Sequence, residues 1–204
     1  MLYINFRKSD NYIRSGFLYP LDEYFAELTP EQIDSRVHEK IWPVIRRKGP
    51  DGEEHIWAMP FGGALGKVLM YRKDLFDEEG IPYPDENWTW ADLYGAARQL
   101  TKPDEGQYGF LTGRGKHESW FWVTFLWSAG GEAMEYDPNA NQWSTTYDSR
   151  NAAVALDYYT LLCSEKWIDA DGSIRRGYTN KEAGNIGAAW SEGKVAMVAH
   201  YIAE

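Results

Sequence analysis

Two short groups of polar and aromatic residues have the side chains needed to bind a small molecule. His117, Glu118 and Trp120 stand at the start of a long apolar segment, and His200 and Tyr201 follow a shorter one. Imidazole, carboxylate and phenol groups exchange hydrogen bonds with hydroxyl groups, while an indole ring offers a flat apolar face. We therefore expect His117, Glu118 and Trp120 to contact a hydroxyl-rich ligand in a cleft, and the side chains of His200 and Tyr201 can form hydrogen bonds with such a ligand.

A third candidate group, Phe61, Gly62 and Gly63, interrupts a run of residues that favours β-structure. Because glycine has no Cβ, the backbone here can approach a ligand closely and offer its amide groups to ligand hydroxyls. We expect a strand before the break, from Ile56, and another after it, through Tyr71. A hinge with a cleft beside it would follow from that arrangement.

Each of these groups also has a purely structural interpretation. Residues 61–63 can form a plain turn, and Trp120 with its neighbour Trp122 can cap the hydrophobic core. A histidine at the end of a strand, such as His200, often hydrogen-bonds only within the fold. Trp190 is interpreted as a packing residue.

Composition narrows the class of ligand. The 204 residues are 44% hydrophobic and 25% charged, as in ordinary globular proteins. Twenty-one basic and 31 acidic residues give a net charge of −10, which disfavours nucleic acid because phosphate binding depends on clustered Lys and Arg. Ten Trp and 14 Tyr provide many amphipathic rings, which suit sugars.

Signals for catalysis, cofactors and metals are weak. The single cysteine excludes an internal disulfide and a cysteine-type zinc site, and the four histidines lack paired ligand spacing. Residues 62–67 resemble a phosphate loop, but Val68 stands where Ser or Thr must hold magnesium. Residues 137–141 resemble a calcium loop, but Gln142 replaces its glycine, and a hairpin turn leading into residues 142–146 explains them with fewer assumptions. The sequence leaves one catalytic alternative open, a pair of carboxylates that act together as in glycosidases, and Glu118 is the first acid to test.

Helices and strands alternate along the chain, which predicts an α/β fold. Thr29 with Pro30, and Thr89 with Asp92, mark helix starts. The apolar spacing and turn residues predict helices over residues 9–15, 30–44, 74–79, 90–100, 120–129, 149–162 and 179–192, and strands over 2–6, 56–59, 68–71, 108–111, 142–146 and 194–199. The helix from residue 120 is apolar nearly all round, so we expect it to be buried on most sides.

Several segments, in their order along the chain, resemble the family 1 extracellular solute-binding proteins, which hand oligosaccharides and related solutes to ABC importers. The segments are Gly16–Tyr24, Met59–Phe76, Trp88–Thr101, Phe125–Gly131 and Ala188–Met197. The resemblance implies a two-lobed periplasmic-binding-protein-like fold of type II, with solute held between the lobes.

The same resemblance implies a domain plan for this chain. Residues 1–60 would form the later part of the first lobe, residues 61–199 the second lobe, and residues 200–204 the start of a return crossing. The chain would then be a fragment whose first lobe is incomplete and whose targeting segment is absent. In maltose-binding members, an aromatic residue at the position matching Trp120 stacks on sugar. The resemblance also implies that His200 and Tyr201 lie at a sheet edge where the family places another ligand-contacting stretch.

The function implied is a non-catalytic solute-binding component of an ABC importer that takes a carbohydrate or oligosaccharide. Its partners would be the solute and the permease membrane subunits, with no nucleic acid, no metal and no cofactor. It would work in the periplasm or outside the cell, where a lipid anchor is compatible with the family. Two alternatives stay open: a glycoside-active enzyme with a Trp-lined cleft, and a stand-alone carbohydrate-binding module.

Overall fold

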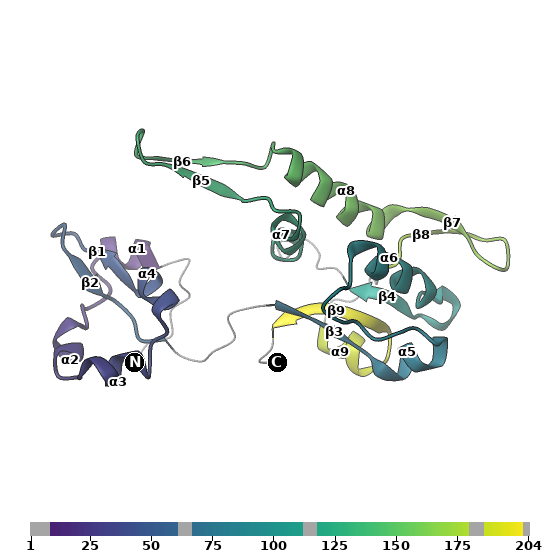
Figure 1. The fold of residues 1–204 in the computed structure, drawn as a ribbon, viewed down its shortest axis with the longest axis horizontal. Helices are drawn as coiled ribbons and strands as arrows, with labels where there is room; N and C mark the ends of the chain where they lie inside the picture. The colour runs from purple at the N-terminus through teal and green to yellow at the C-terminus, as the bar shows by residue number, and fades with distance from the viewer. Residues whose placement is uncertain (1–8, 61–66, 112–117, 180–185, 202–204) are drawn as a thin grey trace. The chain divides into compact units, whose positions relative to one another are not determined.

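The computed structural model describes residues 9–60, 67–111, 118–179 and 186–201 (Figure 1). The chain divides into two compact units, residues 1–64 and 65–204. The lobe plan of residues 1–60, 61–199 and 200–204 concerns a larger two-lobed protein and stays a prediction. The predicted strand over residues 2–6 lies outside the described residues.

The first unit is a small α/β cluster. Its elements are α1 (Ser9–Arg14), α2 (Asp22–Ala26), α3 (Pro30–Asp34), η2 (Glu39–Ile41), α4 (Trp42–Ile45), β1 (Arg46–Lys48) and β2 (Glu54–Ile56). β1 and β2 pair as an antiparallel hairpin. Phe25, Val37, Ile45 and Ile56 are buried together and form the core of this unit.

The predicted single helix over residues 30–44 is wrong, although its start is correct. Thr29 and Gln32 form a complete capping box, but α3 ends at Asp34 and α4 begins only at Trp42. Pro43 has no amide hydrogen and clashes with the preceding turn inside a helix, so it is tolerated only near a helix start. The apolar spacing therefore continues across two short helices.

The second unit is built on a three-stranded sheet in the order β3–β9–β4. The strands are β3 (Lys67–Tyr71), β4 (Tyr108–Leu111) and β9 (Val195–Tyr201). β9 lies between the other two, antiparallel to β3 and parallel to β4.

The strand predicted over residues 56–59, before the break at residues 61–63, is wrong. The strand in this part of the chain, β2, ends at Ile56.

The other elements of this unit are helices and two hairpins, and the hairpins extend away from the sheet (Figure 1). They are α5 (Lys73–Glu79), α6 (Trp90–Gln99), η3 (Pro103–Glu105), α7 (Glu118–Ser128), β5 (Met134–Asp137), β6 (Gln142–Thr145), α8 (Arg150–Ser164), β7 (Lys166–Ile168), β8 (Ile174–Arg176) and α9 (Ile186–Ser191). One buried cluster joins Phe110 and Met197 of the sheet to α6, α7 and α8. A second joins Leu111 and Val198 to Ala189 of α9. The sheet therefore has a buried face on each side.

Three helices differ in detail from the prediction. In the described part of α7, Phe125 and Leu126 are buried and residues 122–124 are half-buried, but Trp127 is 54% exposed. The apolar spacing of α8 predicts a buried face of Ala153, Leu156, Tyr159 and Leu162. The helix buries Ala152, Ala155, Tyr159 and Leu162, while Ala153 and Leu156 are exposed. The last helix does not begin at Thr179: that residue forms a β-bridge, and α9 begins at Ile186.

Candidate ligand-binding site

The candidate site is one edge of the β3–β9–β4 sheet. Because β4 and β9 are parallel, their carboxyl ends lie at the same edge, where Leu111 pairs with Val198. β3 runs the other way, and its first residue, Lys67, pairs with Tyr201. In open α/β sheets, ligands bind outside the carboxyl ends of the parallel strands.

Of the predicted site residues, two lie at this edge and two lie in the helix that follows β4. His200 and Tyr201 are the last residues of β9, paired with Val68 and Lys67. Glu118 and Trp120 lie in the first turn of α7, the helix that follows β4 in the chain. For these four residues the structure describes the backbone alone, so their role as ligand contacts stays a prediction.

The other predicted residues lie outside the described residues. These are Phe61, Gly62 and Gly63, in the segment before β3, and His117, immediately before α7. Their role in binding also stays a prediction.

Sequence reasoning missed a further segment at this edge. Thr179 forms a parallel bridge with Phe110 of β4, and the Phe110 amide donates a hydrogen bond to the Tyr178 carbonyl oxygen at 3.1 Å. The segment Tyr178–Thr179 thus extends the sheet beside β4. A Thr three residues before a Glu resembles a helix cap in sequence, which concealed this role.

A partly buried polar network links α6 to the end of α8. Tyr94 and Tyr178 both donate hydrogen bonds to Oε2 of Glu165, at 2.6 and 2.7 Å. Burial raises the pKa of the Glu165 carboxyl, but these two hydrogen bonds outweigh it and leave the pKa below its ordinary value. Burial raises the pKa of Tyr178. The network therefore joins α6 and α8 through an ionised carboxylate, which favours a structural role over proton donation.

The second unit also has a shallow surface cavity of about 380 Å³. It is lined by Gly95, Arg98, Gln99, Trp167, Ile168 and Tyr178. None of the residues predicted to bind ligand lines it, so we place the candidate site at the sheet edge, where the topology of parallel strands favours binding.

The described parts of the chain contain neither a metal-binding cluster nor a membrane-spanning helix. Within residues 9–60, 67–111, 118–179 and 186–201, no group of three or more His, Cys, Asp or Glu side chains could hold a metal ion. In the same ranges, no helix is long and apolar enough to span a bilayer.

Sequence comparison identifies a family and related proteins. The family described as "Bacterial extracellular solute-binding protein" matches residues 6–204. A protein of Pseudomonas aeruginosa named "Mannitol-binding protein" is 32% identical over 155 residues, which cover 74% of this chain and 34% of that protein.

Solved structures share the fold. An ABC transporter solute-binding protein from Agrobacterium radiobacter, in complex with ribitol, aligns with a TM-score of 0.68 and 22% identity over 97% of this chain and 45% of its own. One from Agrobacterium vitis, with bound D-mannitol, aligns with a TM-score of 0.67 and 22% identity over 98% of this chain and 43% of its own. The chain thus spans less than half the length of these relatives.

These alignments confirm the predicted fold class, an α/β fold of the two-lobed, type II periplasmic-binding kind, of which the chain covers part. The family match covers nearly the whole chain, and this protein therefore belongs to the bacterial extracellular solute-binding proteins.

Proposed function

We propose that this protein binds a sugar or sugar alcohol and delivers it to the membrane subunits of an ABC importer. The observation that carries the proposal is the 32% identity with a protein named as a mannitol-binding protein. The solved structures with bound ribitol and D-mannitol support the same class of solute. The abundance of Trp and Tyr agrees with it, because their rings stack on the apolar faces of such ligands.

The ligand would lie at the carboxyl edge of the β3–β9–β4 sheet, between this unit and the other lobe. Its proposed contacts are Phe61, Gly62, Gly63, His117, Glu118, Trp120, His200 and Tyr201. The positions of Glu118 and Trp120 at the start of α7, and of His200 and Tyr201 at the end of β9, support this assignment. Residues 1–60 and 61–199 would belong to the two lobes, with residues 200–204 crossing back.

The proposed mechanism is closure of the two lobes over the solute, which the permease then recognises. Aromatic rings would stack on the ligand, and side-chain or backbone donors would bind its hydroxyl groups. The protein would return the ligand chemically unchanged and would need no cofactor. It would work in the periplasm or at the cell surface, where a lipid anchor would keep it near the membrane.

The test is a titration of intrinsic tryptophan fluorescence on the protein at its full natural length. The panel is D-mannitol, ribitol, tagatose, maltose and maltotetraose, with each ligand recovered and analysed by chromatography. Saturable binding with unaltered ligand is the expected result. Cleaved ligand would replace the proposal with a glycoside-active enzyme, and no response to any member would remove sugars and sugar alcohols as the ligand class.

A second measurement tests whether the protein delivers its ligand to an ABC importer. Uptake of the ligand identified in this way should be lost when the genes of the cognate permease are deleted, while binding to the purified protein is unchanged. Uptake that persists at the wild-type rate would instead support a carbohydrate-binding module without a transport role.

A further inference from the structure

Thr179 occupies a position at the candidate site that the ligand contacts predicted from sequence do not include. It pairs in parallel with Phe110, the residue before the end of β4. The chain at Thr179 therefore reaches the same sheet edge as the carboxyl ends of β4 and β9.

The side chain of Thr179 points to the α7 side of the sheet. Residues paired directly across neighbouring strands project to the same face. The ring of Phe110 lies against Phe125 of α7, with centroids 6.3 Å apart. The Thr179 hydroxyl is thus on the face covered by the helix whose first turn carries Glu118 and Trp120.

This hydroxyl is buried without a hydrogen bond. Thr179 is 1% exposed, and its Oγ1 has no partner among the described parts of the chain. The indole Nε1 of Trp122, in the second turn of α7, is also buried and unpartnered there. A buried hydroxyl costs free energy unless it is paired, and valine would fill the same volume without that cost. A threonine at this position therefore indicates a use for the hydroxyl.

We propose that the Thr179 hydroxyl is a ligand-binding group, which exchanges a hydrogen bond with a hydroxyl of the bound sugar or sugar alcohol at the floor of the site. A hydroxyl both donates and accepts, so it can pair with a ligand hydroxyl in either sense. This inference rests on the proposed function and adds a specificity-determining residue to it.

The test compares Thr179→Val, which removes the hydroxyl at nearly constant volume, with Thr179→Ser, which keeps it. Binding of D-mannitol and ribitol to the full-length protein is measured by calorimetry, and the Tm is measured without ligand. The valine variant should bind about tenfold or more weakly, with a Tm equal to or above that of the wild type. The serine variant should keep the wild-type affinity within about threefold.

Monodeoxy analogues of the bound ligand make the test specific. The analogue that lacks the hydroxyl contacted by Thr179 should bind the wild type and the valine variant equally, while other analogues keep the difference between the two proteins. A valine variant that binds like the wild type, or that lowers the Tm of the ligand-free protein by several degrees, overturns the inference and leaves the proposed function standing. A wild-type protein that binds no member of the panel overturns both.

Discussion

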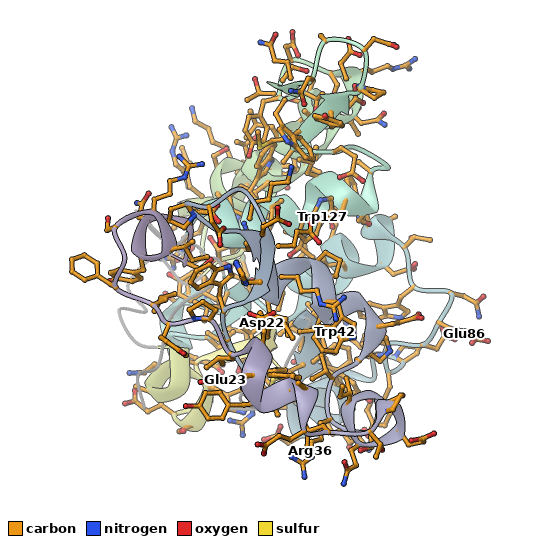
Figure 2. The ribbon with its side chains drawn as sticks, turned by 90° about the vertical axis from the view of Figure 1, so that its left-hand side faces the viewer. Asp22, Glu23, Arg36, Trp42, Glu86 and Trp127 are labelled. Carbon is orange, nitrogen blue, oxygen red and sulfur yellow. The ribbon has the colours of Figure 1, made fainter. Side chains whose placement is uncertain are left out.

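At the scale of single residues, His55 shows how the fold creates a titrating group that the sequence does not reveal. Its Nδ1 lies 3.1 Å from Oδ2 of Asp22, and its Nε2 lies 2.8 Å from Oδ2 of Asp51. Asp22 stands at the start of α2 and is labelled in Figure 2. Only a protonated imidazole can donate to both carboxylates. The hydrogen bond with Asp51, followed by that with Asp22, raises the pKa of His55 against the opposing effect of desolvation.

This arrangement predicts a pH-dependent stability for the first unit. Folding raises the pKa of His55 above its unfolded value of about 6.5, so the stabilisation is fully present below that pH and is lost as pH rises through the folded-state pKa. The His55 pKa measured by NMR should therefore exceed about 6.5. His55→Gln should remove this part of the pH dependence in urea unfolding, and Glu27→Gln, at the end of α2, should preserve it. A measured pKa at or below the unfolded value would contradict the prediction.

Two tryptophans of α7 provide a matched test of ligand binding, one as the predicted contact and the other as a surface control. Trp120, a predicted ligand contact, lies in the first turn of α7. Trp127, labelled in Figure 2, lies in the last turn of the same helix and is 54% exposed. If Trp120 stacks on the ligand, Trp120→Ala should weaken sugar binding at least tenfold, or about 1.4 kcal/mol. Trp127→Ala should leave affinity unchanged. If Trp120 only caps the core, its replacement should instead lower stability by about 3–5 kcal/mol.

At the scale of elements, local signals that depend on neighbouring residues were predicted well. The capping box of Thr89 and Asp92 at α6 is confirmed, with Asp92 Oδ2 accepting from the Thr89 amide at 2.8 Å. The hairpin turn between β5 and β6 is also confirmed. Such signals involve only three to five consecutive residues, so they can be recognised from the sequence without knowledge of tertiary contacts.

Elements defined by tertiary contacts were predicted less well. Tyr159 and Leu162 of α8 are buried as predicted. Ala152 and Ala155 take the buried positions expected for Ala153 and Leu156, because the helix packs there through small residues with a weak apolar signal. The β7–β8 hairpin was missed, since its exposed Ile168 and Ile174 give no alternation that points to a core. The sheet edge was inferred from family resemblance, because strand order cannot be obtained from periodicity alone.

The close packing of α6 on β4 gives a matched pair of glycine predictions. A Cβ added to Gly109 of β4 would lie closer than 3.0 Å to the backbone of Ala97 in α6, whereas one added to Gly95, also in α6, would meet no atom within 4 Å. Gly109→Ala should therefore destabilise the protein by about 1–3 kcal/mol, and Gly95→Ala should stabilise it by up to about 1 kcal/mol. Urea unfolding measures both. Equal effects of the two changes would contradict the packing of α6 on β4.

At the scale of the whole molecule, the two units have separate cores. Phe25 and Ile56 belong to the first, and Phe76 and Phe110 to the second. Separate cores permit hinge motion between lobes when the chain between them can change conformation. Ligand binding in the proposed closure would then connect two units that are otherwise stabilised independently.

This connection predicts how ligand affects thermal unfolding of the full-length protein. A ligand that binds only the folded state adds RT ln(1 + [L]/Kd), or about 2.7 kcal/mol at a free concentration of 100 times Kd. If the ligand contacts both lobes, calorimetry should show both unfolding transitions rising together with ligand concentration. Trp127→Ala, as the control, should show the same rise. A rise confined to one transition would place the ligand on one unit alone and would contradict closure as the mechanism.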